Sequence, residues 1–273
     1  MSVILTLALK EFRDGMRNRW VAAAIVLLAG LTLAVALLGS APVGTTKATP
    51  LSVIVASLSS LSVYLVPLIA LMLSYSAIVG EAERGTLLLL LSYPVSRWQV
   101  IVGKFAGHLA ILSVAITLGY GVAAGVAAYP AFSSADIRAL FLLIGSSILL
   151  GAVFLALGYL LSAIAREQAT AAGAAVALWL AMVLLYDLAL VGVLLADSGH
   201  FISEQLFAAL LIVNPADAFR IFNLSQLGVG AVAGLGGLGT TASVPPSVAL
   251  GSMTLWVLGS GLLALNRFGA RQP

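Results

Sequence analysis

Histidine, cysteine and clustered carboxylates carry most catalytic and metal chemistry, and this sequence offers few of them. It has no cysteine, and its two histidines, His108 and His200, lie far apart among scattered acids. No spacing typical of a metal site occurs. We find neither a Gly-x-Ser-x-Gly motif in a suitable context nor a phosphate-binding Gly-x-x-x-x-Gly-Lys-Ser/Thr loop. We therefore expect no catalytic, cofactor or metal site, and any ATP hydrolysis must occur on another chain.

One polar segment combines paired acids, a glycine and a run of leucines. Glu81 and Glu83 stand where an apolar run meets water. Gly85 can end a helix there, and Thr86 can cap the next one, which Pro94 would stop. This pattern predicts a short apolar helix outside the membrane, whose exposed leucines need a partner surface. The alternative is a loop folded back on the bilayer face, and the residues alone favour neither.

A second polar segment follows the fifth apolar run and opens with a turn signal at Asn214-Pro215. Phe219 is an aromatic of the kind that anchors at an interface or fills a partner pocket. Asp217 and Arg220 are three residues apart and can pair on a helix surface, which is as good an account as contact with a partner. Further on, the glycine-rich run 228–239 fits a short re-entrant helix or a pliant loop.

Asp187 is the one acid inside an apolar run. A charge at the centre of a bilayer costs about 2.5–3.5 kcal/mol or more, so such a residue suggests a substrate pathway or a hydrogen bond at a dimer interface. The simpler alternative is that the helix breaks near Tyr186, so that Asp187 caps a segment or reaches the outer water layer. We favour the break.

The composition implies that lipid surrounds most of the chain that positions these residues. It is 62% hydrophobic and 8% charged, with a mean hydropathy of +1.14, whereas soluble domains carry about a quarter charged residues. A span needs roughly 20 apolar residues, and the second run contains Pro67, where we expect a kink. The sequence predicts an all-α membrane protein whose six spans lie at about 20–40, 53–79, 101–129, 139–164, 169–196 and 248–265.

An amphipathic helix is expected at residues 3–19, ahead of the first span. Apolar side chains recur there at intervals of three and four, and Lys10, Arg13, Asp14 and Arg17 occupy the opposite face. Basic helices of this kind lie in the membrane interface. The alternative is an extension of the first span. We expect no cleavable signal peptide, because the basic lead is long and patterned.

The basic residues predict that both termini are cytoplasmic, because loops on that side carry an excess of lysine and arginine. The inner set is Lys10, Arg13, Arg17, Arg19, Arg84, Arg97, Lys104, Arg166, Arg267 and Arg271. The outer set is Lys47, Arg138 and Arg220. The expected organisation is a helix at 1–19 and one transmembrane domain at 20–273, with a cytoplasmic loop at 80–100 and an outer segment at 197–247.

The string GEAERGTLLLLLSYPVSRWQVIVGK, which covers about 25 residues, resembles the cytoplasmic signature of ABC-2 type permeases. The resemblance implies six helices per subunit, an N-terminal amphipathic elbow and a coupling helix that docks on a separate nucleotide-binding subunit in a bacterial inner membrane. Leu89 departs from the pattern, because many relatives have Glu there. The residues to which the resemblance gives a coupling role are Glu81, Glu83, Arg84, Gly85, Thr86, Leu87, Pro94 and Arg97.

The string NPADAFRI at 214–221 is similar to a narrower branch of that family, which serves assembly of the copper–sulfur centre of nitrous oxide reductase. This similarity implies a homodimer, two copies of an ATPase and a periplasmic β-helical partner protein. The outer positions concerned are Asn214, Pro215, Asp217, Phe219 and Arg220. Because the five methionines and two histidines are scattered, we expect the permease itself not to bind copper. The alternatives are an ABC-2 exporter for an unrelated lipid, drug or polysaccharide, or an ion-driven secondary transporter.

Overall fold

The computed structural model describes residues 3–17, 23, 26–27, 29–34, 50–128, 134–196, 203–226 and 244–270. Most of the first expected span, Lys47, His200 and the glycine-rich run 228–239 lie outside these ranges. Residues 29–34 are helical, and Ala29 passes 3.6 Å from the place where a Cβ on Gly119 would stand. The part of the first run that is described therefore packs along the third expected span.

Five long helical segments are apolar enough to cross a membrane. They comprise α3 (Pro50–Ser74) continued by α4 (Val79–Glu83), α6 (Arg97–Ala128), α7 (Ser134–Ile164), α8 (Gln168–Trp179) continued to α9 (Tyr186–Ala196), and α12 (Pro246–Ala270). A bent pair, α10 (Glu204–Val213) and α11 (Pro215–Gln226), gives a sixth candidate span if it is counted as one. The described residues contain only helices and connections, which confirms the all-α membrane fold.

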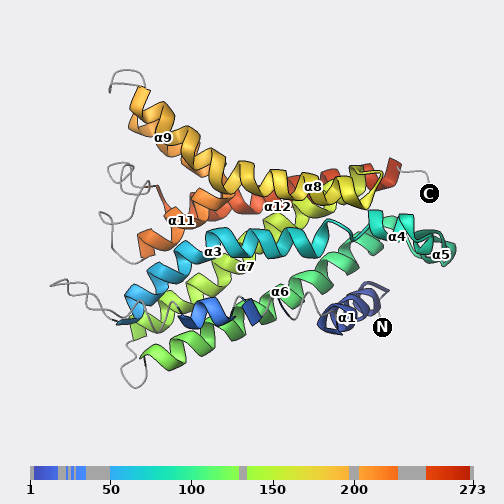
Figure 1. Ribbon diagram of the computed structural model, residues 1–273, viewed down its shortest axis with the longest axis horizontal. Helices are drawn as coiled ribbons and strands as arrows, with labels where there is room; N and C mark the ends of the chain where they lie inside the picture. The colour runs from blue at the N-terminus through green and yellow to red at the C-terminus, as the bar shows by residue number, and fades with distance from the viewer. Residues whose placement is uncertain are drawn as a thin grey trace.

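Helix α7 lies at the centre of the bundle and packs against α3, α6, α11 and α12 (Figure 1). Its glycines permit this, because a side chain at Gly151 would run into Leu112, and one at Gly158 would run into Ser74. Close helix approach at small residues is the usual way in which membrane helices gain packing. Pro67 lies inside α3, which continues as one helix on both sides of it.

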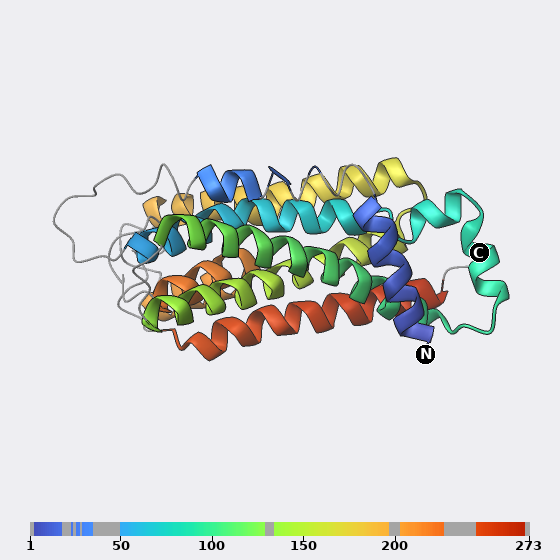
Figure 2. The same cartoon turned by 90° about the horizontal axis from the view of Figure 1, so that it is seen from below.

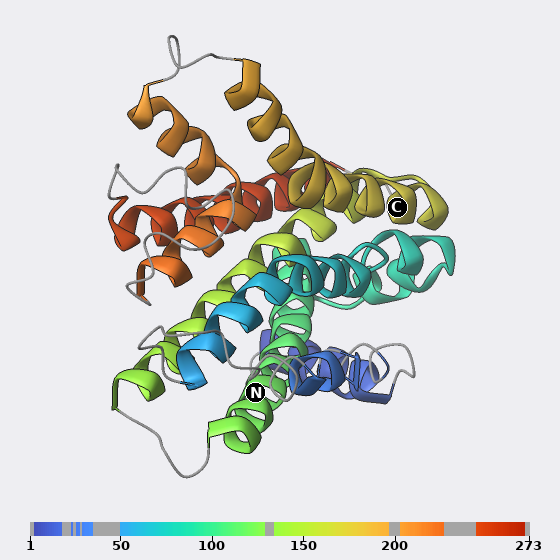
Figure 3. The same cartoon turned by 60° about the vertical axis from the view of Figure 1, so that its left-hand side comes forward.

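The fifth span departs from the others in both shape and burial. A π-helical turn, η1 (Leu180–Leu185), joins α8 to α9, so the helix continues without a break to Ala196. In Figures 1 and 3, α9 diverges from the bundle. Only 11% of the most apolar stretch of this span is buried, against 56–61% for the second, third and fourth spans. Other helices of the chain therefore cover little of the most apolar stretch of this span.

Helix α1 (Val3–Arg17) lies across the ends of the long helices and packs on α6 (Figure 2). Leu7 is buried, and the charged side chains of the opposite face are exposed. The contact is close because α6 carries glycines there: a Cβ on Gly107 would stand 2.8 Å from the carbonyl oxygen of Ala8. The helix expected to lie in the interface is thus docked on a span by its backbone.

Helices α10 and α11 meet at an angle of 113°, and Asn214 forms the corner. Its Oδ1 accepts a hydrogen bond from the amide of Ala216 at 3.0 Å, an Asx turn that starts α11. Ser203 caps the start of α10 by accepting from the amide of Leu206. The chain therefore folds back at Asn214, whereas residues 228–239, which we expected to form a re-entrant helix or a loop, lie outside the described residues. Two ends of the bundle can now be named: the α5 end, which carries α1, α4 and α5, and the opposite α11 end.

Candidate coupling site

The segment between α4 and α6 forms the short helix α5 (Thr86–Ser92), followed by extended backbone at Tyr93. Gly85 stands before α5 with φ of +71°, a conformation that favours glycine. Thr86 does not cap α5 as we expected. Gly85 occupies the cap position, and the Thr86 hydroxyl donates instead to the carbonyl oxygen of Glu81 at 3.2 Å. Pro94 follows the helix and is exposed.

The leucine run of α5 divides into a buried side and an exposed side. Leu87 is 3% exposed and packs into the core at this end of the bundle, so it is unavailable to a partner. Leu88, Leu89 and Tyr93 are 57%, 67% and 68% exposed. Helix α5 projects beyond the ends of the long helices (Figures 1 and 2). An apolar patch in that position suits contact with another protein.

The two flanks of α5 are bound to the ends of two spans. Before α5, Oε1 of Glu83 accepts a hydrogen bond from the backbone amide of Gln168 at 2.6 Å, where α8 begins. After α5, Arg97 donates to the carbonyl oxygens of Phe268 and Gly269 at 2.8 and 2.9 Å, where α12 ends. A carboxylate at a helix N-terminus and a cation at a C-terminus both complement the helix dipole. The two flanks of α5 are therefore connected to α8 and α12.

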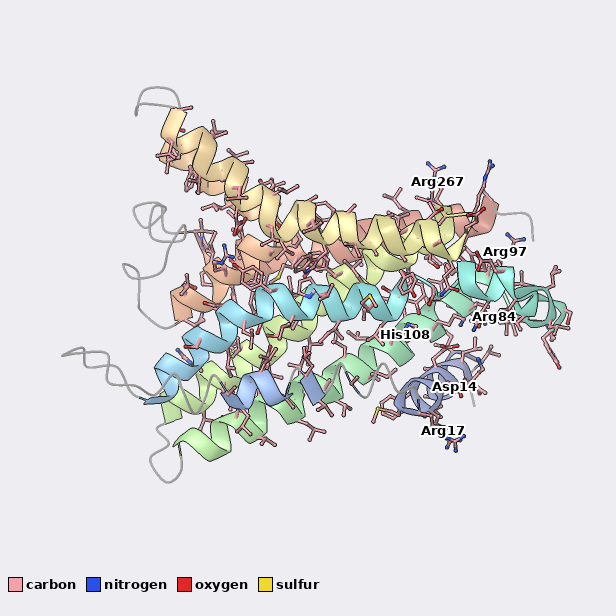
Figure 4. The ribbon with its side chains drawn as sticks, in the orientation of Figure 1. Asp14, Arg17, Arg84, Arg97, His108 and Arg267 are labelled. Carbon is pink, nitrogen blue, oxygen red and sulfur yellow. The ribbon has the colours of Figure 1, made fainter. Side chains whose placement is uncertain are left out.

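Arg84 does not take part in these contacts, although we grouped it with them. Its Nε donates to the carbonyl oxygen of Gly80 at 2.9 Å, within its own segment, and its side chain is otherwise exposed. Figure 4 places Arg84, Arg97 and Arg267 at the α5 end, with Arg17 on α1. Arg84 remains on the surface of the site.

Glu81 belongs to a charge cluster that the sequence did not reveal as one site. Lys104 on α6 donates to Oε1 of Glu81 and to Oε1 of Glu11 on α1, both at 2.7 Å. Oε2 of Glu11 lies 3.7 Å from Nε2 of His108, whose Nδ1 lies 2.8 Å from the hydroxyl of Tyr159 on α7. The Lys104 side chain is 4% exposed. This cluster joins α1, α4, α6 and α7.

Two signals in the sequence hinted at this cluster. Glu11 lies four residues after Leu7, so it shares the buried face of an otherwise basic helix. Lys104 and His108 share one face of α6 by the same spacing. Burial disfavours the charged form of Glu11, but Lys104 outweighs it and lowers the pKa of Glu11 below the ordinary value of 4.5. The carboxylate is therefore held in its ionised form.

A second polar cluster lies toward the α11 end. Arg220 on α11 pairs with Asp187 of α9 at 3.1 Å and with Asp217 at 2.8 Å. Asn214 donates to Oδ2 of Asp217 at 3.2 Å and to the carbonyl oxygen of Met182 at 2.7 Å. The helix break that we favoured at Tyr186 is wrong, because the helix continues there, and the Asp187 carboxylate is paired with Arg220. Asp217 and Arg220 do form the pair that was one of our two accounts, but Asp217 is buried and does not lie on the helix surface.

The π turn explains how the fifth span reaches this cluster. A π turn interrupts the regular i to i−4 bonding, and the carbonyl oxygen of Met182, inside it, accepts from Asn214. One residue beyond the turn, the Tyr186 hydroxyl donates to the carbonyl oxygen of Leu210 at 2.6 Å.

Phe219 is fully buried in the main core, so it is not the exposed partner anchor that we proposed. Pro215 begins α11 and is buried as well.

Across the described ranges, no group of three or more histidine, aspartate or glutamate side chains is arranged to hold a metal ion. Four charged side chains at the α5 end instead bind other helices of the same chain: Glu81, Glu83, Arg97 and Lys104. They lie next to α5, whose apolar side is exposed.

Comparison with known proteins agrees with this arrangement. The family described as ABC-2 family transporter protein matches residues 5–272. The chain is 44% identical to the probable ABC transporter permease protein NosY of Pseudomonas aeruginosa over 276 aligned positions, covering all of both chains. It is 42% identical to the protein of the same name from Stutzerimonas stutzeri, covering 99% of each. The chain therefore belongs to the ABC-2 family and is a NosY-like permease subunit of an ABC transporter.

Proposed function

We propose that the segment from Glu81 to Arg97 receives a separate, NosF-like ATPase subunit and passes its movement to the spans. What supports this is the structure of α5: it exposes Leu88 and Leu89, while contacts on both of its flanks bind it to the ends of other helices. A docking helix without such contacts would move alone. Here a push on α5 is carried to α8 by Glu83.

The proposed orientation puts the α5 end in the cytoplasm of a bacterium, with the inner membrane around the spans. Helix α1 and the last turn of α12 lie at that same end (Figure 2), which agrees with an even number of crossings. The basic residues Arg17, Arg84, Arg97 and Arg267 also lie there (Figure 4). Cytoplasmic ends carry such an excess of positive charge. ATP and magnesium would then bind to the partner ATPase.

The similarity to two NosY permeases supports a finer proposal about the biological task. We propose that the chain forms a homodimer that works with a NosD-like periplasmic β-helical protein in copper–sulfur site assembly for nitrous oxide reductase. The outer segment at 197–247, which contains α10 and α11, would gate the pathway or meet that protein. The permease itself would not bind copper during transport. Tight stoichiometric binding of Cu(I) by the purified subunit would overturn that last statement.

The docking proposal is tested by making the exposed side of α5 polar. We expect the double substitution Leu88→Ser and Leu89→Ser to weaken co-purification with the ATPase at least tenfold, because interface anchors are worth about 1 kcal/mol or more each. ATP turnover of the isolated complex should fall with it. Met16→Ser is the matched control, because Met16 is an apolar side chain 43% exposed on α1 at the same end. Unchanged association in the double variant would refute the docking site.

A further inference from the structure

We propose that Lys104 is a positioning residue that carries movement of the coupling segment to helix α1 and to α6 together. This inference rests on the proposed function of α5. It goes further by assigning a transmission role to Lys104 and Glu11, which lie outside the segment that resembles the coupling loop proper. Helix α1 then becomes a moving part of the coupling apparatus in addition to its place at the membrane surface.

The first support is the geometry of the charges. One buried ammonium group, on Lys104, binds carboxylates from two separate segments at equal distances of 2.7 Å. Glu81 lies on α4, directly before α5, and Glu11 lies on α1. Both carboxylate side chains are mostly buried, 15% and 12% exposed, so water screens these contacts little. A displacement of Glu81 therefore pulls on Lys104, and through it on Glu11.

The second support is the backbone contact between α1 and α6. A Cβ on Gly103 would stand 2.7 Å from Cβ of Leu7, and one on Gly107 would stand 2.7 Å from Cβ of Glu11. No flexible side chain separates the two helices at these points. This close approach brings Glu11 within direct reach of Lys104, so the ion pair forms across the helix contact with nothing between them.

The third support is that the start of α4 is held by α7, whereas its other end leads into α5. Ser162 on α7 accepts hydrogen bonds from the amides of Ile78 and Val79 at 2.9 and 3.0 Å, which holds the start of α4. Glu81 lies one turn or less beyond, on the side toward α5. A displacement of α5 thus rotates α4 about its start and moves the Glu81 carboxylate relative to Lys104.

The fourth support is an unpartnered oxygen. Among the described residues, Oε2 of Glu81 is buried and has no hydrogen-bond donor. The neighbouring His108 and Tyr159 are engaged with each other at 2.8 Å. Only Oε1 of Glu81 binds Lys104, so Oε2 can accept a hydrogen bond from another donor when α4 shifts.

The test uses the whole complex in lipid nanodiscs and exploits the absence of cysteine in the chain. Spin labels are attached to cysteines introduced at Met16 on α1 and Phe141 on α7, which are 43% and 69% exposed. Pulsed electron resonance then measures the distance between them without nucleotide and after trapping with ADP and vanadate. Association with the ATPase is measured first for every variant, and its failure in the unsubstituted protein would refute the proposed docking function at that step.

We expect trapping to shift the label distance in the unsubstituted protein, and Glu11→Gln to reduce that shift at least fourfold while the ATPase stays bound. Glu11→Gln keeps the Lys104–Glu81 contact and is nearly the same shape, so the fold is preserved. Asp14→Asn is the matched control, because it removes an exposed carboxylate from the same helix. It should keep the full shift.

A second pair of variants addresses Lys104 itself. Lys104→Met should lose the shift as Glu11→Gln does, whereas Lys104→Arg keeps a cation able to bind two carboxylates and should retain at least half of it. A full shift in Glu11→Gln, or equal behaviour of Lys104→Met and Lys104→Arg, would overturn the inference. So would the absence of any shift in the unsubstituted protein while its ATPase is bound.

Discussion

Replacing Arg220 with methionine should destabilise the α11 end of the permease more than any single substitution of its acidic partners. The guanidinium is the one cation that binds Asp187 at 3.1 Å and Asp217 at 2.8 Å within the described cluster. The side chains of Arg220, Asp187 and Asp217 are 16%, 15% and 2% exposed. Its removal leaves two carboxylates close together with little water around them.

The size of the effect follows from this burial. Removing one partner of a buried ion pair costs about 3–5 kcal/mol, and the partial exposure of Arg220 and Asp187 places this case near 3 kcal/mol. Each kcal/mol lowers the unfolding midpoint of a chain of this size by about 2–4 °C, so Arg220→Met should lose roughly 6–12 °C. Asp187→Asn leaves the Arg220–Asp217 pair intact and should cost about 1 kcal/mol.

Thermal unfolding of the purified permease in detergent, followed by tryptophan fluorescence, measures these differences. The double substitution Arg220→Met with Asp217→Asn removes the cation together with one carboxylate. It should recover about 1–3 kcal/mol relative to the sum of the two single costs, because neighbouring groups are not additive. A midpoint for Arg220→Met within 1 °C of that for Asp187→Asn would refute the argument. A double variant that loses the full sum would refute it as well.

Three further predictions concern the α5 end. Gly107→Leu should detach helix α1, because a Cβ at residue 107 would meet the α1 backbone, and faster protease cleavage near residue 10 would show it. Gly121→Ala is the control: no atom lies within 4 Å of its Cβ position, so it should be neutral or stabilise the protein by up to about 1 kcal/mol. Gly85→Val should cost about 1–2 kcal/mol in thermal unfolding, because its φ of +71° strains any side chain. Burial opposes the charge of Glu11, but Lys104 lowers the pKa of Glu11 below 4.5. The ionised carboxylate therefore stabilises the fold fully above pH 4.5, and this stabilisation disappears as the pH falls through the lower pKa of the folded state. Below pH 4.5 the unfolding midpoint should drop more steeply in the unsubstituted protein than in Glu11→Gln.

The helical framework could be predicted because hydropathy and length constrain a membrane chain so strongly. Long apolar runs correspond to α3, α6, α7, α8 with α9, and α12 within a few residues. The bounds of the short helix between Gly85 and Pro94 could also be predicted, since a glycine and a proline flank it, but the residues alone did not decide between that helix and a loop on the bilayer face. These are local properties, and each depends on a stretch of adjacent residues.

The charge cluster could not be predicted because it depends on contacts between distant segments. Glu11 and Lys104 are separated by 93 residues along the chain, and their meeting requires α1 to dock on the glycines of α6. The same reason explains the misplacement of Phe219. Its helix folds back at Asn214 into the bundle, so an aromatic in a segment between spans becomes part of the core.

The pairing of Lys104 with acids from other segments has a consequence for how the chain is made. During synthesis Lys104 enters the membrane with α6 when Glu81, shortly before it, and Glu11, near the N-terminus, have already emerged. In the orientation proposed above, its positive charge would first act as a signal that retains its end of α6 on the cytoplasmic side. The pairing with Glu11 would follow only when α1 docks. Helix α1 would therefore remain undocked at the membrane surface until α6 is inserted. In chains truncated before Arg97, residue 11 should be accessible to labelling from the cytoplasm.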